Sequence, residues 1–130
     1  MNYEELINQA IQVKENAYVK YSGFHVGAAL LGESGRIYTG CNVENASYGG
    51  TICAERTAVV KAISEGEKKF RAIAIVSDSS SYTMPCGICR QFLSEFGLDI
   101  KIIMPGKDNI RVMTLSELLP EAFTSDDLEK

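Results

Sequence analysis

The sequence predicts one α/β domain spanning residues 1–130, with helices covering both faces of a mixed five-stranded sheet in a three-layer α/β/α arrangement. Short segments rich in β-branched and aliphatic residues alternate along the chain with segments of helical periodicity. The 130 residues suffice for one hydrophobic core and leave no room for a second. No repeat, low-complexity tract or linker interrupts this order.

The first half of the chain predicts a helix followed by a hairpin. Residues 3–17 carry apolar side chains at helical spacing, and Asn2 with Glu5 resembles a helix cap and its reciprocal partner. Residues 26–31 and 36–41 read as strands joined across a short turn that contains glycine. Residues 42–44 are expected to extend the second strand, which would point Asn42 and Glu44 toward the same face.

The second half predicts two helices, 53–65 and 87–96, around a buried strand at 71–77. Gly66 follows the first of these helices as a C-cap. The strands 100–104 and 110–113 are separated by five residues, too few for a helical crossover, so they are expected to pair antiparallel. Thr114 with Glu117 predicts a capped short helix at 115–119. The two helices that begin near cysteines are expected side by side on one face of the sheet.

Composition limits the classes of function. The hydrophobic fraction of 45% is ordinary for a globular protein. A net charge of −4 argues against nucleic-acid binding, which depends on neutralising phosphates, and favours a small-molecule substrate. No apolar run reaches the length of a membrane span, and the first residues lack the features of a secretion signal. We therefore expect a cytoplasmic protein whose four cysteines stay reduced.

Two short motifs concentrate the reactive groups, Cys-Ala-Glu-Arg at 53–56 and Pro-Cys-Gly-Ile-Cys at 85–89. Residues three apart are neighbours on a helix surface, so Cys86 and Cys89 can bind one ion, with Cys53 as the third ligand. Zinc prefers tetrahedral thiolate coordination, and a site with three protein ligands leaves one position for water. This arrangement is typical of a catalytic rather than a structural zinc.

Glu55 is the candidate catalytic residue. On a regular helix a step of two residues turns about 200°, which would point Glu55 away from a metal held by Cys53. We infer that Cys53 lies at the start of its helix, where non-helical backbone angles let the two side chains converge. The alternative is an ordinary exposed glutamate on a helix.

Two other residues compete for the metal. Cys41 offers a fourth sulfur for a structural four-cysteine site, although such sites usually come as two Cys-x-x-Cys pairs. His25 is the single histidine, a residue type that is more often packed or exposed than ligating when it stands alone. We expect neither to bind the metal.

Arg56 is the candidate partner of the metal's ligands. Zinc with three thiolates carries a formal charge of −1, which weakens its ability to acidify water. The N-termini of the two helices and the guanidinium of Arg56 can offset this charge. The alternative for Arg56 is a surface salt bridge.

The chain resembles the small zinc-dependent cytidine deaminases, in the cytidine/deoxycytidylate deaminase family. The motifs just described, a Cys-Ala-Glu and a Pro-Cys-x-x-Cys, are typical of zinc deaminases. The matching blocks follow in order over nearly the whole chain: YSGFHVGAAL at 21–30, GCNVENASY at 40–48, CAERTA at 53–58, PCGICRQ at 85–91 and LLPEAF at 118–123.

The resemblance implies the family's fold, one zinc ion per subunit, and hydrolysis of cytidine and deoxycytidine to uridine and deoxyuridine in pyrimidine salvage. A zinc-activated water would attack C4 of the base, and Glu55 would carry its proton to ring nitrogen N3. The family pattern also implies that Asn42 and Glu44 bind the ribose hydroxyls, that Phe24 packs on the pyrimidine, and that the backbone of Ala54 contacts the base. The alternative for Phe24 is core packing.

The same resemblance implies a homotetramer with shared pockets. Ala46 and Tyr48 would reach into a neighbour's site from one subunit, and Phe123 would cover the base from another. Two alternative functions remain at this point: a deaminase of another aminopyrimidine, such as a blasticidin-type antibiotic or a base in nucleic acid, and a non-enzymatic zinc domain, which would need no Glu55.

Overall fold

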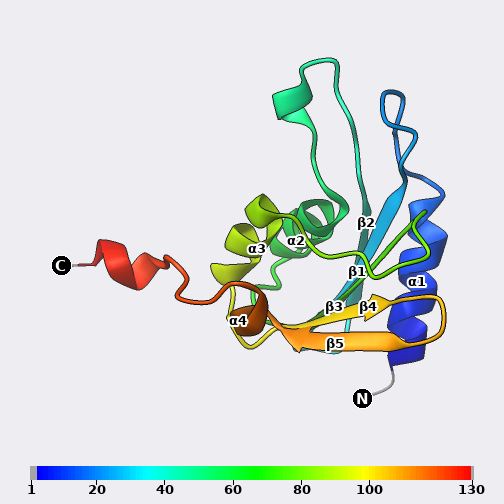
Figure 1. The fold of residues 1–130 in the computed structure, drawn as a ribbon. Helices are drawn as coiled ribbons and strands as arrows, with labels where there is room; N and C mark the ends of the chain where they lie inside the picture. The colour runs from blue at the N-terminus through cyan, green and yellow to red at the C-terminus, as the bar shows by residue number, and fades with distance from the viewer. Residues whose placement is uncertain (1–2, 130) are drawn as a thin grey trace.

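The computed structural model describes residues 3–129 and contains one five-stranded sheet with helices on both faces (Figure 1). The elements run in the order α1 (Tyr3–Lys14), β1 (Val26–Gly32), β2 (Ile37–Cys41), the 3₁₀ helix η1 (Tyr48–Gly50), α2 (Ala54–Ser64), β3 (Phe70–Ser77), α3 (Gly87–Ser94), β4 (Lys101–Pro105), β5 (Ile110–Thr114), α4 (Leu115–Leu118) and the 3₁₀ helix η2 (Ser125–Leu128).

The sheet is mixed, with strand order β2-β1-β3-β4-β5. Strand β1 pairs antiparallel with both β2 and β3, and β3 pairs parallel with β4. Strands β4 and β5 pair antiparallel, with Lys101 opposite Thr114, as the five-residue connection predicts. Strand β3 is buried on both faces because helices cover both sides, which explains its nearly continuous apolar sequence.

The sheet separates two hydrophobic cores, one beneath each helical layer. Helix α1 packs Leu6 and Ala10 against one face of the sheet, where Ala29, Ala74 and Ile103 point. Helices α2 and α3 lie side by side on the other face, as expected, over a larger cluster that includes Leu30, Ile75 and Leu93. Alternation along β1 explains the division, because Ala29 and Leu30 point to opposite faces.

Two glycines in the hairpin let helices approach the sheet closely. A Cβ on Gly27 would lie 2.1 Å from the carbonyl oxygen of Ala10, so α1 packs directly on the β1 backbone. A Cβ on Gly40 would lie 2.4 Å from the backbone nitrogen of Ala58 and 2.6 Å from the carbonyl oxygen of Ala54. Gly40 therefore lets the first turns of α2 lie directly on the sheet. These turns carry the motif at 53–56.

The structure corrects several expected boundaries. Helix α1 ends at Lys14 rather than at residue 17, because Tyr18 leaves the helix and pairs its backbone with Asn42 and Glu44. Residues 42–44 do not continue the β2 ladder on β1; Val43 instead forms isolated bridges with Tyr18 and Ile52. Helix α3 ends two residues early, at Ser94. The expected Asn2 cap lies outside the described residues.

Other expectations about helix ends are confirmed. Thr114 and Glu117 form a reciprocal capping box at the start of α4. Gly66 adopts a φ of +95° just after α2, the left-handed conformation that glycine supplies at helix C-termini. Within residues 3–129, no helix combines the length and the apolar character needed to cross a bilayer.

Candidate active site

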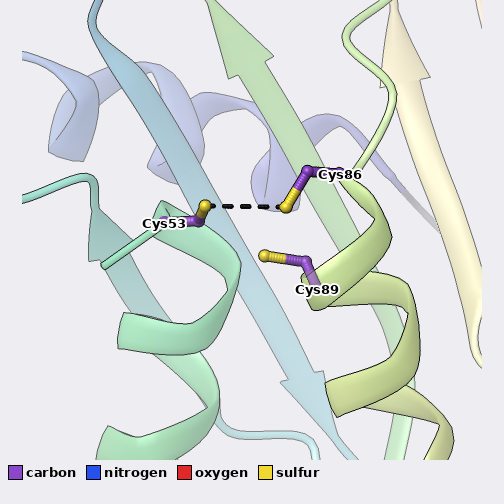
Figure 2. A group of neighbouring side chains, drawn as sticks. All are labelled: Cys53, Cys86 and Cys89. Atoms are coloured by element: carbon purple, nitrogen blue, oxygen red, sulfur yellow. Dashed lines mark hydrogen bonds between the residues drawn. The ribbon is translucent and has the colours of Figure 1, made fainter. Parts of the chain in front are cut away.

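Three thiols meet between the first turns of α2 and α3 (Figure 2). Cys53 is the N-cap of α2 and Cys86 the N-cap of α3, both with extended backbone angles. Cys89 lies in the first turn of α3, so that its sulfur faces the same space as that of Cys86. The inference that Cys53 stands at the very start of its helix is confirmed.

The spacing of the sulfurs fits a zinc ion. The three Sγ atoms all lie within 4.8 Å of one another, and those of Cys53 and Cys86 are 3.7 Å apart. A tetrahedral site with zinc–sulfur distances of about 2.3 Å has sulfur–sulfur edges of about 3.8 Å. The three cysteines could therefore hold zinc with little rearrangement, and both helix N-termini would place partial positive charge beside the thiolates.

The thiols are strongly coupled to one another. Hydrogen bonding from Cys89, and then from Arg56 and Cys86, lowers the pKa of Cys53 to about 5 against the opposing effect of burial. The pKa of Cys89 is raised, because its hydrogen bond to Cys53 and its burial both favour the neutral thiol. In the absence of metal, one sulfur of the cluster thus carries charge at neutral pH and a neighbour keeps its proton.

Glu55 is buried beside the thiols, with only 4% of its surface exposed. It occupies the second position of α2, and burial raises its pKa to about 7, with the nearby charge of Cys53 adding to the effect. The interpretation of Glu55 as an exposed helical glutamate is therefore wrong. A buried carboxyl group with a pKa near neutrality is suited to both accept and release a proton.

Arg56 points toward the cluster rather than into a surface salt bridge. Its Nη2 donates to the Sγ of Cys53 at 3.7 Å and to the carbonyl oxygen of Thr51 at 3.3 Å. The thiolate of Cys53 raises the pKa of the guanidinium. Arg56 Nε is buried, and within the described part of the chain it has no hydrogen-bond acceptor. A donor left over at this place fits a site in which three cysteines bind metal as thiolates and so offer hydrogen-bond acceptors.

A pocket opens directly over the cluster. Its lining contains Cys53, Ala54, Glu55 and Cys86, together with Phe24 and Asn42 from the opposite wall. It also contains residues that the sequence interpretation missed: Val26, Thr51, Thr83 and Met84. Three of these residues stand within three positions of a cysteine of the cluster, and this closeness in sequence could have indicated that they line the site.

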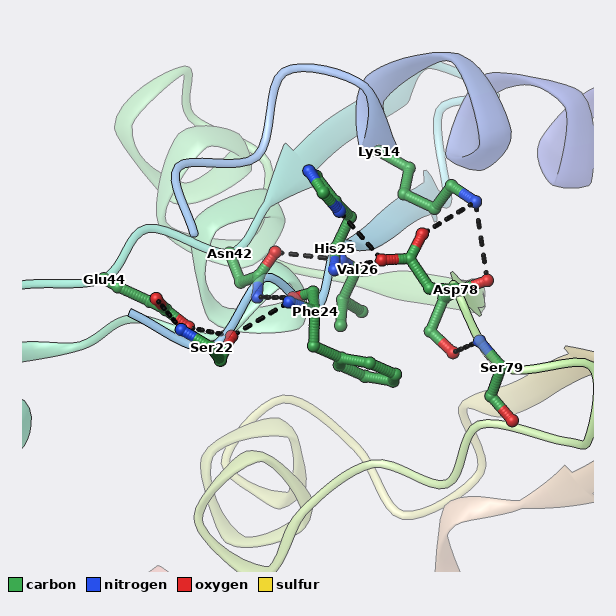
Figure 3. A network of polar contacts seen from close by, with 10 residues as sticks. Lys14, Ser22, Phe24, His25, Val26, Asn42, Glu44, Asp78 and Ser79 are labelled. Atoms are coloured by element: carbon green, nitrogen blue, oxygen red, sulfur yellow. Dashed lines mark hydrogen bonds and ion pairs between the residues drawn. The ribbon is translucent and has the colours of Figure 1, made fainter. Parts of the chain in front are cut away.

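Asn42 and Glu44 hold the loop that carries Phe24 (Figure 3). Asn42 donates to the carbonyl oxygen of Phe24 and accepts from the backbone nitrogen of Val26, both at 2.9 Å. The carboxylate of Glu44 accepts from the backbone nitrogens of Tyr21 and Ser22 and from the Ser22 hydroxyl. These hydrogen bonds, that of the hydroxyl first, lower the pKa of Glu44, so it is ionised at neutral pH.

Other residues singled out in the sequence lie outside this pocket. Ala46 and Tyr48 are exposed on the segment that reaches away from the sheet between β2 and α2, with Tyr48 packed edge-on against Tyr21. Phe123 is exposed on the C-terminal tail, where its carbonyl oxygen accepts from Gln91. Among the described residues, Cys41 is not part of the thiol cluster, which leaves the four-cysteine alternative without its fourth ligand.

The fold and the site together define a class of protein. A three-thiol cluster at two helix N-termini, with a buried carboxyl group beside it and a pocket above, is the arrangement of zinc-dependent hydrolytic deaminases. A family model described as the cytidine and deoxycytidylate deaminase zinc-binding region matches residues 1–104. The chain belongs to this family, and zinc is its cofactor.

Similarity to individual proteins extends over nearly the whole chain. It is 50% identical to a cytidine deaminase of Halalkalibacterium halodurans and 48% identical to one of Sporosarcina psychrophila; each alignment covers 98% of this chain, and 98% and 96% of the relative. The crystal structure of cytidine deaminase from Burkholderia pseudomallei superposes with a TM-score of 0.90 at 42% identity, covering 95% of this chain and 100% of that one.

Proposed function

We propose that this protein catalyses the hydrolytic deamination of cytidine and deoxycytidine to uridine and deoxyuridine, with release of ammonia. The observation that carries the proposal is the buried carboxyl group of Glu55 at a thiol cluster that floors a pocket also lined by Phe24 and Asn42. Zinc held by Cys53, Cys86 and Cys89 would supply the Lewis acidity that activates a water molecule. The full-length similarity to cytidine deaminases supports the choice of substrate.

Glu55 moves the proton in this scheme. Its pKa near 7 lets it take a proton from the attacking water and deliver it to N3 of the cytosine ring, and later to the departing ammonia. Arg56 offsets the negative charge of the thiolates through its hydrogen bond to Cys53, and the unpaired Nε is a second donor available for the same purpose.

The opposite wall binds the nucleoside. Phe24 offers an aromatic face to the pyrimidine, and the backbone of Ala54, at the start of α2, contacts the base. Asn42 uses one amide hydrogen and one oxygen lone pair on the loop, so a second hydrogen and lone pair stay free for a ribose hydroxyl. One oxygen of Glu44 likewise accepts a single hydrogen bond and keeps capacity for the sugar.

We also propose a homotetramer in which subunits complete each other's pockets. Tyr48 is 75% exposed and Phe123 is 57% exposed, large amounts for aromatic side chains. Two further apolar side chains are strongly exposed, Ile88 at 65% and Leu128 at 70%. Ala46 and Tyr48 would contribute to one neighbour's pocket and Phe123 to another's.

Co-expression tests whether Phe123 acts across subunits. Chains with Glu55→Ala and chains with Phe123→Ala should each be impaired alone. In a mixed assembly, a chain with intact Glu55 would receive Phe123 from its neighbour and recover activity. Failure of any recovery, or a fully active monomer in light scattering, would contradict the shared pocket.

We place the protein in the cytoplasm, in pyrimidine salvage, and acting on free nucleosides rather than polymers. The net charge of −4 and the carboxylate of Glu44 both oppose the binding of phosphates. A phosphate on the sugar would meet this carboxylate, so the nucleotide CMP should be a poor substrate.

One assay tests the proposed function. Loss of ultraviolet absorbance is followed with cytidine, deoxycytidine, cytosine and CMP, each with and without a zinc chelator. The two nucleosides should be turned over and the chelator should abolish the signal. Glu55→Ala should lose turnover while its zinc content stays equal to that of the unmodified protein. Activity on CMP alone would overturn the substrate assignment.

A further inference from the structure

Beyond the end of the strand ladder, side chains help attach the pocket wall that carries Phe24 to the sheet (Figure 3). Strand β1 begins at Val26, so the residues before it lie beyond the regular pairing of β1 with β2 and β3. On the β2 side, Asn42 bonds the backbone of Phe24 and Val26. On the β3 side, Asp78 bonds the backbone of His25.

Asp78 forms three contacts with His25. Its Oδ2 accepts from the His25 backbone nitrogen at 2.8 Å and lies 2.8 Å from Nδ1 of the ring, while its own backbone nitrogen donates to the His25 carbonyl oxygen at 3.1 Å. The first of these bonds is the main cause that lowers the pKa of Asp78 to about 2. The carboxylate is therefore charged at every working pH, when its hydrogen bonds are strongest.

Asp78 is itself held in place by the rest of the network. Lys14, at the end of α1, lies 3.4 Å from Oδ1, a position it reaches because Gly27 lets α1 pack on β1. The neighbouring Ser77 exchanges a 2.6 Å hydrogen bond with Thr83, which lines the pocket just before Cys86. Asp78 thus stands where the wall that carries Phe24 meets the loop that leads to the cluster.

We propose that Asp78 is a positioning residue that fixes Phe24 at the distance from the thiol cluster at which it stacks on the base. Asn42 and Glu44 also hold this loop, but both are assigned to the sugar: Asn42 lines the pocket, and Glu44 lines a second hollow that shares Thr51 with it. Asp78 is not among the pocket-lining residues, so its effect on the substrate passes through the backbone of His25 to the adjacent Phe24. The inference rests on the proposed function of Phe24.

The test uses the zinc-loaded protein and steady-state deamination of cytidine. Removing a base–aromatic stack weakens binding about 5- to 150-fold, so Phe24→Ala should raise KM within that range. Asp78→Ala should raise KM about three- to tenfold, which is less than complete loss of the Phe24 stack. Its kcat should stay within about twofold and its zinc content should not change. A raised KM at constant kcat is the signature of lost substrate binding without loss of chemistry.

A double variant separates positioning from general stability. If Asp78 acts through Phe24, the Phe24→Ala, Asp78→Ala protein should have a KM within about twofold of Phe24→Ala alone. His25→Ala should change KM by less than about twofold, since the backbone contact to Asp78 persists. Asp108→Ala, an exposed carboxylate in the turn between β4 and β5, is the matched control and should leave KM unchanged.

Each outcome decides between the two proposals. If Phe24→Ala leaves KM unchanged, the stacking role in the proposed function fails. If Phe24→Ala raises KM while Asp78→Ala does not, or the two effects multiply in the double variant, the positioning role of Asp78 is overturned. Asp78→Asn keeps one acceptor for the His25 nitrogen and should give a KM between those of the unmodified protein and Asp78→Ala. Failure of both Asp78 variants to fold would mark Asp78 as a structural residue and also overturn the inference.

Discussion

Replacing Glu55 with glutamine should stabilise the metal-free protein at alkaline pH, although it removes the carboxyl group that we propose as catalytic. Glu55 is buried, and desolvation is the main cause that raises its pKa from 4.5 to about 7. The folded protein therefore binds this proton more tightly than the unfolded chain does. Ionising Glu55 above pH 7 places an unwanted charge in the interior, whereas glutamine has the same shape and no charge.

The size of the effect follows from the pKa difference. Each pKa unit corresponds to about 1.36 kcal/mol, so a rise from 4.5 to about 7 amounts to about 3 kcal/mol. The contribution of Glu55 to the free energy of unfolding is fully present below about pH 4.5. It is lost as the pH rises to about 7, because between these values the folded state holds a proton that the unfolded state has released.

Urea denaturation of chelator-treated protein at pH 5 and at pH 8 measures the difference. The free energy of unfolding of Glu55→Gln should exceed that of the unmodified protein by up to about 3 kcal/mol at pH 8 and by much less at pH 5. Glu15 is an exposed glutamate beyond the end of α1, and Glu15→Gln is the control. It should shift the free energy of unfolding by less than about 0.5 kcal/mol at both pH values. With zinc bound, Glu55→Gln should lower kcat about 10²- to 10⁴-fold. The reasoning is refuted if Glu55→Gln is less stable than the unmodified protein at pH 8, or if the difference is the same at both pH values.

Three further predictions concern how the cluster is built. Gly40→Ala should destabilise the fold by about 1–3 kcal/mol and lower zinc retention, because its Cβ would collide with the backbone of α2. Thermal unfolding and metal content measure the two effects. Gly49→Ala is the control and should change neither, because a Cβ at Gly49 meets open space. Arg56→Gln should weaken zinc affinity about 10- to 100-fold in a chelator competition, and unchanged affinity would count against its role. Cys89→Ser should lose zinc while Cys41→Ser retains it, and loss of zinc from both variants would restore the four-cysteine alternative.

Local spacing was sufficient to predict much of the site. Cys86 and Cys89 stand three residues apart in the first turn of a helix, so helical geometry alone places both sulfurs on one side. The expectation that Cys53 precedes its helix followed from the two-residue step to Glu55, and the structure confirms it. The antiparallel pairing of β4 and β5 followed from the length of their connection.

The errors arose where distant segments compete with local pattern. The helical spacing of residues 3–17 continues past Lys14, but Tyr18 gains backbone pairing with Asn42 and Glu44, and the helix ends early. Residues 42–44 look like the continuation of a strand. The side chains of Asn42 and Glu44 instead hydrogen-bond the loop that carries Phe24. Neither outcome can be read from a window of neighbouring residues.

The reactive groups of this protein could be predicted from its sequence, because local helix geometry places Cys86 beside Cys89 and a helix start places Cys53 near Glu55. Packing of distant segments brings the two cysteine motifs together, buries Glu55 and leaves Cys41 outside the cluster. It also lets Asp78 hold His25 across 53 residues of chain. The physical reason is that helix geometry acts over three or four residues, while burial and the pairing of distant loops depend on how the layers pack.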